Sequence, residues 1–375
     1  MEQFIKYVGL DVHGKTIAAS VADNRSVEVR FIGEMLNTPE AMAKLVKQLQ
    51  TRGAKLSFCY EAGPCGYGIH RQLLALGQPC QVVAPSLIPK KAGDRVKTDR
   101  RDSLMLARLH RAGELTAVWV PDGEHEALRD LTRARGDMKD LERRSRQRLL
   151  ALLLRHGRRY EGKSHWTQAH FRWLETIKFE QPVQRIVMQE YIDTVTHCSK
   201  RVAALDQQIE QAAHASAVWP VIEALMALRG VQLLTATTTV AEIGDLKRFA
   251  GAPQLMAYLG LVPSEHSSGE RQRRGGITKT GNSEVRRVLV EAAWTYRFAA
   301  RKTRTLQKRA ACCDEKIQAI ACDAQTRLCH RYRHLTDAGK IKVQVVTAVA
   351  RELAGFIRAI GQAVPAPTAK VNTSQ

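Results

Sequence analysis

The N-terminal part of the chain alternates short apolar runs with turn residues. The runs are FIKYVGLDV, TIAASVAD and SVEVRFIGEML, and they are separated by His13-Gly14-Lys15 and by Asp23-Asn24. Apolar runs of this length, broken by residues that favour turns, are typical of consecutive β-strands. We therefore predict three strands joined by tight turns.

After these strands, helical and strand patterns alternate. A helix is predicted at about 38–51, where Thr38 can cap the first turn and Pro39 fits it. A strand (KLSFCYEAG), a helix at about 67–77, a strand (CQVVAP) and a helix beginning near Thr98 follow. This order predicts an α/β domain with a mixed sheet over residues 1–120.

From residue 121 the pattern becomes helical. Two long amphipathic stretches, at about 122–157 and 181–214, flank a connector that contains Trp166, Phe171 and Trp173. This arrangement predicts an antiparallel, coiled-coil-like hairpin over residues 121–215. Apolar residues recur at helical spacing in the first stretch, at Leu128, Leu131, Met138, Leu141, Leu149, Leu152 and Leu153.

Residues 216–360 are predicted to form a mainly helical domain. It contains a helix ending at Arg229-Gly230, two short helices, the basic loop SSGERQRRGGITKTGN, an arginine-rich helix and a last helix near 340–360. The join at Gly230 resembles a helix-hairpin-helix, whose loop amides can accept a DNA phosphate, although a glycine there can also simply end a helix. We expect a disordered tail over 361–375, and the overall fold class is α/β plus α.

The charge of the chain changes the picture of its partners. Lys and Arg number 58 against 37 Asp and Glu, giving a formal net charge of +21. An excess of this size favours a polyanionic partner, because neutralising phosphates releases condensed counterions. No segment approaches 18 apolar residues and the N-terminus lacks the layout of a signal peptide, so we expect a cytoplasmic protein without a membrane partner.

Basic residues are concentrated on the first long helical stretch. Between positions 126 and 159, ten arginines and one lysine stand against five acidic residues. Either this is a solvated helix face, or it is a rod that contacts phosphates. The eight cysteines form no CxxC pair, which favours buried or incidental thiols over a zinc site.

Four carboxylates are candidates for a metal centre. Asp11 and Glu61 come at the ends of predicted strands, and Asp99 and Asp102 lie three residues apart, on one face of a predicted helix. Asp11 could instead form a turn and Asp99 could instead cap the helix. Mg²⁺ requires hard oxygen ligands, and two ions about 4 Å apart can stabilise both oxygens of a phosphoryl displacement.

A strand-end Asp, a strand-end Glu and a D-x-x-D helix, in this order, resemble the RuvC-like (RNase H-like) domain of DEDD transposases. The nearest resemblance is to the insertion-sequence-110 family, and it covers almost the whole chain. The segments that carry it include YVGLDVHGKTIAASVAD, CYEAGPCGYGIHRQL, VVAPSLIPKKAGDRVKTDRRDSLMLARL and RRGGITKTGNSEVRRVLVEAAW. The resemblance implies a recombinase of an insertion sequence with a C-terminal transposase domain.

The resemblance also implies a mechanism. In this family the four acids bind divalent metal, Mg²⁺ or Mn²⁺, and a serine attacks the DNA phosphate to form a transient phosphoserine link. The matching residue is Ser268, with Ser267 as the alternative. The carboxylates and the serine are expected to come from different protomers, which implies a homo-oligomer, plausibly a dimer of dimers.

The partners implied by the resemblance are donor and target double-stranded DNA and a noncoding bridge RNA that guides the protein. Binding of nucleic-acid backbones is expected from basic residues in the first domain, the helical hairpin and the C-terminal domain, namely Arg100, Arg101, Arg143, Arg144, Arg148, Arg273, Arg274, Lys279, Arg286 and Arg287.

Two other functions stay open on the sequence. One is a metal-only RuvC-like nuclease, such as a junction resolvase, with water as the nucleophile. The other is a non-catalytic protein that binds DNA or RNA with a degenerate nuclease fold. The serine-containing block argues against the first, and the presence of all four acids argues against the second.

Overall fold

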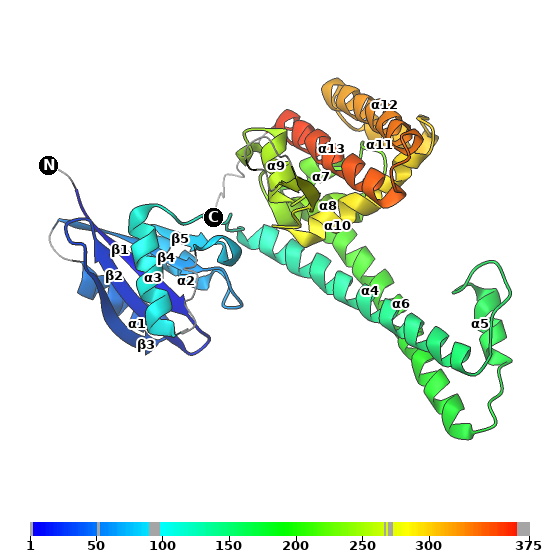
Figure 1. Cartoon of the computed structure of the whole chain (residues 1–375), viewed down its shortest axis with the longest axis horizontal. Coiled ribbons are helices and arrows are strands. Elements are labelled where there is room, and N and C mark those ends of the chain that lie inside the picture. Colours follow the sequence, from blue (N-terminus) through cyan, green and yellow to red (C-terminus); the bar gives the residue numbers. More distant parts are fainter. Residues whose placement is uncertain (1–2, 51–52, 90–97, 266–267, 269–272, 366–375) are drawn as a thin grey trace, which may run out of the picture. The chain divides into compact units, whose positions relative to one another are not determined.

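The computed structural model describes residues 3–50, 53–89, 98–265, 268 and 273–365. It divides into two compact units, one formed by residues up to Val120 and one that starts at Pro121 (Figure 1). The predicted disordered tail falls mainly on residues outside this described part.

The first unit is built on one mixed five-stranded sheet. Its strands are β1 (Phe4–Val12), β2 (Thr16–Asp23), β3 (Val29–Leu36), β4 (Ala54–Glu61) and β5 (Cys80–Val83), in the order β3-β2-β1-β4-β5. The first three pair antiparallel, whereas β4 runs parallel to both β1 and β5. All five strands were predicted, and a sheet of this kind is compatible with an RNase H-like domain.

Helices cover both faces of this sheet. On one face, α1 (Pro39–Leu49) and α2 (Gly68–Ala75) pack over a core that includes Leu10, Phe58 and Tyr60. On the other face, α3 (Asp99–Ala112) packs through Leu106 onto Cys59 and Val83 (Figure 1). Successive residues of a strand point to opposite faces, so the two cores use alternate positions of β4.

The second unit begins with two long helices, α4 (Gly123–Arg155) and α6 (Pro182–Ala215). They pack antiparallel: Arg135 donates to Asp206, and Ser199, seven residues earlier on α6, donates to Glu142. The short α5 (Gln168–Glu175) closes an apolar cluster at the far end, where Trp166 and Trp173 meet Leu153.

The middle of this pair of helices departs from the predicted apolar seam. Leu141 is 41% exposed, whereas its neighbour Glu142 is buried. Lys139, Arg146 and Ser199 surround the Glu142 carboxylate with hydrogen bonds. Burial alone would raise the pKa of Glu142, but the hydrogen bonds from Lys139 and Ser199 and the positive charges of Arg146 and Lys139 hold it below its usual value.

The C-terminal part of this unit is a helical bundle around one large core. Its elements are α7 (Trp219–Leu225), α8 (Leu233–Ile243), α9 (Ala252–Tyr258), α10 (Ser283–Ala293), α11 (Arg304–Ala311), α12 (Glu315–Asp337) and α13 (Lys342–Ala363), with short 3₁₀ turns η2 (Leu246–Arg248) and η3 (Trp294–Arg297). The last helix therefore continues three residues beyond its predicted end, because Ile360 and Val364 are buried in the core.

The sequence makes Gly230 a candidate for a phosphate-binding hairpin, and the structure gives it a packing role. Its φ is +81°, and a Cβ there would lie 2.4 Å from the carbonyl oxygen of Ala292 and 2.5 Å from Oγ1 of Thr295. Only glycine allows this left-handed conformation and this close approach without strain. Because the glycine faces the end of α10, packing is sufficient to explain it.

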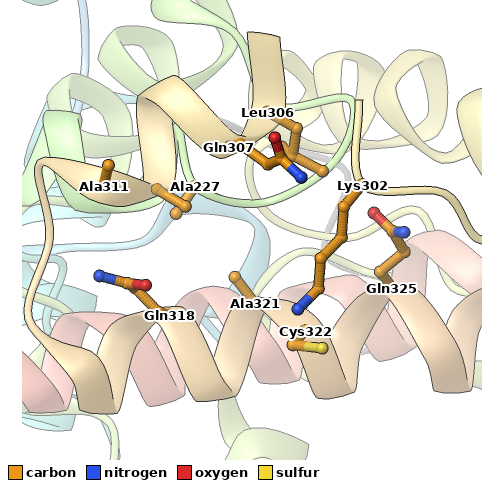
Figure 2. Close-up of a pocket in the computed structure, with 10 residues that line it drawn as sticks. Ala227, Lys302, Leu306, Gln307, Ala311, Gln318, Ala321, Cys322 and Gln325 are labelled. Atoms are coloured by element: carbon orange, nitrogen blue, oxygen red, sulfur yellow. The ribbon is translucent and has the colours of Figure 1, made fainter. Parts of the chain in front are cut away.

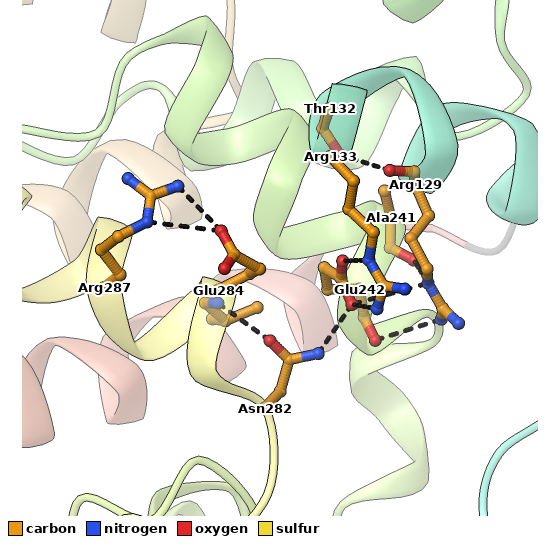
Figure 3. Close-up of polar contacts among 9 residues, drawn as sticks. Arg129, Thr132, Arg133, Ala241, Glu242, Asn282, Glu284 and Arg287 are labelled. Carbon is orange, nitrogen blue, oxygen red and sulfur yellow. Dashed lines mark hydrogen bonds and ion pairs between the residues drawn. The ribbon is translucent and has the colours of Figure 1, made fainter. Parts of the chain in front are cut away.

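A buried ion-pair cluster joins α4, α8 and the start of α10 (Figure 3). The carboxylate of Glu242 accepts from Nε of Arg133 at 2.7 Å, from Nη2 of Arg133 at 3.0 Å and from the amide of Asn282 at 2.7 Å. Asn282 in turn caps α10 by accepting from the backbone amide of Val285. Arg129 adds bonds to the carbonyl oxygens at the end of α8.

Candidate metal centre and nucleic-acid-binding residues

Contacts between the sheet and α3 fix where the first turn of this helix lies. The ring of His110 packs edge-on against Tyr7, and its Nε2 lies 2.8 Å from Oγ of Ser57. Ala107 lies one helical turn before His110, and Gly9 lies two residues after Tyr7 on β1. Gly9 faces the backbone of α3 there, since a Cβ on Gly9 would lie 2.3 Å from the Ala107 nitrogen. The start of α3 therefore lies over the C-terminal ends of β1 and β4.

The beginning of α3 is set by Thr98, whose side chain accepts from the backbone amide of Arg101. The alternative that Asp99 is the cap is therefore wrong. Asp99 and Asp102 both lie in the first turn, where the positive end of the helix dipole favours carboxylates. This explains how two acids are tolerated in one helical turn.

Asp11 is part of the sheet and not of the following turn. It pairs with Ala18 in the antiparallel ladder, and the turn is closed by the amide of His13 donating to Thr16. The turn-forming alternative for Asp11 is therefore wrong as well. Because Asp11 is two residues beyond Gly9, its side chain points to the face of the sheet that α3 covers.

Asp11, His13 and Asp99 meet at this edge. Nε2 of His13 lies 3.4 Å from Oδ2 of Asp11 and 3.5 Å from Oδ1 of Asp99. Among the residues that the structure describes, these three form a group whose ligand atoms all lie within 4.8 Å of one another. The Asp11 side chain is 16% exposed, against 52% for the other two, so the group opens to solvent on one side.

Asp102 acts electrostatically on Asp11. Burial raises the pKa of the Asp11 carboxyl, the interaction with His13 opposes that rise, and the negative charges of Asp102 and Asp99 increase it. Closely spaced carboxylates cannot all ionise at low cost without a cation. The donor set of carboxylate oxygens with one imidazole fits a divalent metal ion.

Glu61 lies at the same edge without joining the group of three. Leu10 of β1 and Tyr60 of β4 are register partners, and the next residue on each strand is Asp11 and Glu61 respectively. Cys59 donates from its thiol to Leu106 of α3, so Glu61, two residues further on, points to the same face. Glu61 is exposed at this position.

Ser268 lies in the second unit, between the strands of a small hairpin that the sequence did not predict. The strands are β6 (Pro263–Glu265) and β7 (Arg274–Ile277), which pair antiparallel. Ser268 is exposed, and Ser267 lies outside the described residues. The base of this hairpin is held by close packing, since a Cβ on Gly281 would lie 1.9 Å from the carbonyl oxygen of Tyr258.

The predicted nucleic-acid-binding residues fall into two groups. The first group is exposed and comprises Arg100, Arg101, Arg143, Arg144, Arg148, Arg273, Arg274, Lys279 and Arg287. In this group, Arg100 lies over the ring of Phe31. Four others also contact acidic residues: Arg143 and Arg144 contact Asp140, Arg274 contacts Glu265 and Arg287 contacts Glu284. Arg286 differs, because its guanidinium donates to the carbonyl oxygens of Leu259 and Thr280. Arg286 therefore holds the hairpin base in place.

Comparison with known proteins identifies the family. Residues 8–157 match a DEDD transposase family model, and residues 222–308 match the model described as the transposase IS116/IS110/IS902 family. The putative transposase y4qE of Sinorhizobium fredii is 48% identical over 357 residues, covering 95% of this chain and 88% of that protein. The chain belongs to the IS110 family of DEDD transposases.

Other relatives agree with this assignment. The transposase for insertion sequence element IS1533 of Leptospira borgpetersenii is 29% identical over 88% of this chain and 96% of its own length. A pilin gene-inverting protein of Moraxella lacunata is 28% identical over 53% of each chain. This IS110-family protein is therefore a DNA transposase, an enzyme that recombines DNA, and membership of the DEDD family implies the use of divalent metal.

His13 is the residue of this site that the sequence did not reveal as a ligand. The sequence places His13 only in a predicted turn, and its imidazole reaches Asp11 and Asp99 because that turn folds back toward the strand end. A histidine two residues after a strand-end aspartate could have drawn attention to it. The transposase also has no helix, in the part of the chain that is described, that is long and apolar enough to cross a membrane.

Proposed function

We propose that this transposase cuts and rejoins DNA at the ends of an insertion sequence, with Mg²⁺ held by Asp11, Glu61, Asp99 and Asp102 and with Ser268 as the nucleophile. In this proposal the first unit is a RuvC-like catalytic domain, and the antiparallel pair α4 and α6 is a coiled-coil-like rod. The observation that carries the proposal is the group of Asp11, Asp99 and their neighbours at one sheet edge.

A bound metal would supply positive charge to the phosphate and help to stabilise the oxygens of the displacement. Asp11 and Asp99 offer oxygens on one side, and Asp102 and Glu61 extend the set along the same edge. An alternative donor set would replace one acid with His13. The donor set fits a divalent cation, and Mg²⁺ is the ion that all-oxygen ligands favour.

The covalent step exchanges one phosphoester for another. Oγ of Ser268 bonds to the phosphorus of a DNA phosphodiester while the bond from that phosphorus to a deoxyribose oxygen breaks. The serine proton passes to a base, and the departing oxygen takes up a proton. Attack by a hydroxyl of the recombining strand then releases the serine, so that no external energy source is required.

The proposed partners are donor and target DNA duplexes and a noncoding bridge RNA, bound in the cytoplasm by a homo-oligomer that is a dimer of dimers. A guide RNA would read sequence by base pairing, so the protein would need mainly backbone contacts. The net charge of +21 supports such a role. Exposed Arg144 and Arg148 on α4 would supply part of it.

Trapping a covalent adduct tests the nucleophile. Wild-type protein with a nicked element-end substrate should give a protein–DNA adduct, and Ser268→Ala should give none. Ser283→Ala, which changes an exposed serine at the start of α10, is the matched control and should retain the adduct. Persistence of the adduct in Ser268→Ala together with its loss in Ser267→Ala would move the role to Ser267.

Neutral variants of the acids test the metal centre. Asp11→Asn, Glu61→Gln and Asp102→Asn should each abolish strand exchange and leave DNA binding largely intact, whereas Asp337→Asn, at the exposed end of α12, should do neither. Cleavage that survives in Ser268→Ala and Ser267→Ala but requires the acids would support the alternative of a metal-only nuclease. Normal exchange in any one acid variant would remove that acid from the centre.

A further inference from the structure

A pocket in the C-terminal bundle lies away from Ser268 in the sequence and outside the carboxylate-bearing unit. It has a volume of about 270 Å³ and opens between α11 and α12 (Figure 2). Lys302, Leu306 and Gln307 line it from the side of α11, and Gln318, Cys322 and Gln325 line it from α12. Three amide side chains, one ammonium group and an apolar wall are thus collected in one small pocket.

Gln325 is the residue that marks this pocket as a binding site. Its side chain is buried, with 6% of the residue exposed, and its Oε1 atom has no hydrogen-bond partner. A buried acceptor without a partner destabilises the folded chain, because the desolvation of its oxygen is not compensated. An external donor that enters the pocket would satisfy this oxygen.

The segment that leads into the pocket is strongly basic. Residues 297–309 contain six cationic residues and no acidic one, and Arg301, Lys302 and Arg304 are exposed. The same segment carries Phe298, 54% exposed, with the guanidinium of Arg297 over its ring at 4.6 Å. Cations interleaved with an exposed aromatic ring are typical of surfaces that bind single-stranded nucleic acid.

We propose that this pocket binds an unpaired purine, preferably adenine, of a single-stranded nucleic-acid segment. An amide side chain can accept from the N6 amino group of adenine and donate to its N7, so Gln325 would gain the donor that it lacks. The volume lies just below the range of about 300–1,000 Å³ typical of drug-sized ligands, which suits one base. The surrounding cations would hold the phosphates on either side.

This site is independent of the chemistry proposed for Ser268 and the acids, and it depends only on the handling of nucleic acid by a transposase. Its ligand could belong to a DNA strand that is unpaired during recombination or to an RNA. Adenine presents the same base edge in DNA and in RNA, so the experiment uses a DNA strand and an RNA strand. Loss of covalent adduct formation and loss of pocket binding can then be observed separately.

Binding of labelled single strands tests the pocket. Oligo(dA) and oligo(A) of equal length, followed by fluorescence anisotropy, are compared with a strand of the same length that lacks the bases. Gln325→Leu should weaken binding of the adenine strands by about tenfold and leave the abasic strand unchanged, because only the base edge is lost. Gln344→Leu, on the exposed side of α13, is the control and should change neither.

The stability of the variant separates a binding role from a structural one. Replacing an unsatisfied buried amide by leucine should leave the melting temperature equal or higher, while a structural role would lower it. A second variant, Ala311→Trp, should block the pocket from its exposed rim and weaken the adenine strands in the same way. A preference for oligo(dA) would assign the ligand to DNA, and a preference for oligo(A) to RNA.

Thiol labelling of the wild-type protein gives a direct footprint. Cys322 lines the pocket, and the exposed Cys312 lies outside its lining, so the two thiols serve as probe and reference. Adenine strands should slow the alkylation of Cys322 several-fold relative to Cys312, as followed by mass spectrometry, and the abasic strand should not. Equal alkylation rates with all strands, or unchanged affinity in Gln325→Leu and Ala311→Trp, would overturn the proposal.

Discussion

Nε2 of His13 lies 3.4 Å from Oδ2 of Asp11, so the turn after β1 brings a nitrogen ligand back to the carboxylate at the end of the same strand. The imidazole is also 3.5 Å from Asp99. It therefore occupies a position between two carboxylates where a cation would be stabilised.

His13→Ala should weaken Co²⁺ binding by about tenfold or more and Mg²⁺ binding much less. Imidazole is a good ligand for the later transition metals, whereas Mg²⁺ prefers oxygen. Calorimetry with each ion on the full chain measures the difference, and the double variant His13→Ala/Asp99→Asn gives the background from cation sites elsewhere. Equal losses for both ions would mean that His13 only orients the carboxylates, and no loss would exclude it from the centre.

The sequence was sufficient to predict the five strands of the first unit and the strand ends where Asp11 and Glu61 lie. The apolar runs that end at Asp11 and Glu61 form β1 and β4, and the cap at Thr98 begins α3 one residue before Asp99. Strand pattern is local, so it can be read along the chain, whereas the choice of Thr98 over Asp99 as the cap of α3 came from the structure. The parallel pairing that puts Asp11 and Glu61 side by side is long-range, and only the structure supplies it.

The burial of individual residues on α4 also depends on contacts with distant segments, so the sequence did not predict it. The pattern of leucines suggested an apolar seam along α4, yet Glu142 is buried and Leu141 is exposed. The partners that make this burial tolerable include Ser199, which is 57 residues away. A local period identifies a helix but does not identify which polar residues will find partners in a distant segment.

The ion pair between Glu242 and Arg133 should contribute strongly to the stability of the second unit. The Glu242 side chain is 1% exposed and also accepts from Asn282 (Figure 3). Glu242→Gln should lower the free energy of unfolding by about 3–5 kcal/mol, because it removes the negative charge beside the buried guanidinium of Arg129, whose side chain is 10% exposed. Denaturant unfolding followed by tryptophan fluorescence measures this loss.

Glu284→Gln is the matched control for that variant. Glu284 also pairs with an arginine, Arg287, but both side chains are substantially exposed, at 38% and 47%. An exposed pair of this kind contributes about 0–1 kcal/mol. Similar losses of stability in the two variants would contradict the view that burial makes Glu242 important.

His110 should make the first unit sensitive to acid. Burial lowers the pKa of His110 to about 4, from an ordinary value near 6.5. Between these values the unfolded chain binds a proton that the folded chain does not, so stability is complete above about pH 6.5 and is lost as the pH falls toward 4. The full effect is roughly 3 kcal/mol.

Replacing His110 tests this pH dependence. In His110→Gln the side chain can still bond to Ser57 but cannot titrate, so the decline of unfolding free energy between pH 6.5 and pH 4 should become shallower than in the wild type. Denaturant titrations at several pH values give the two slopes. Parallel curves would show that other groups cause the acid sensitivity.

The basic face of α4 should contribute to the electrostatic part of nucleic-acid binding. Arg144→Glu with Arg148→Glu should weaken binding of DNA and reduce the slope of log affinity against log salt by about 2, since each phosphate contact contributes about 1. The exposed pair Lys44→Glu with Lys47→Glu on α1 changes net charge equally and serves as the control. An unchanged slope in the α4 variant would favour a face that is merely solvated.

Close packing at Gly9 should be required for the metal centre. A Cβ at this position would lie 2.3 Å from the backbone nitrogen of Ala107 and 2.5 Å from the carbonyl oxygen of Ser103, so Gly9→Ala must push α3 away from β1. Overpacking of this kind costs about 1–3 kcal/mol. It should also separate Asp99 and Asp102 from Asp11 and weaken Mg²⁺ binding and strand exchange together.

Gly14→Ala distinguishes this effect from a general intolerance of the β1–β2 region. Gly14 lies in the turn after the strand, and nothing lies within 4 Å of an added Cβ. The free energy of unfolding of Gly14→Ala should therefore differ from that of the wild type by less than about 0.5 kcal/mol, and this variant should retain Mg²⁺ binding. Because a displaced α3 alters the site even in molecules that stay folded, the decisive measurement is Mg²⁺ affinity under conditions where both variants are fully folded. Equal affinities there would mean that the distance between α3 and β1 does not control the centre.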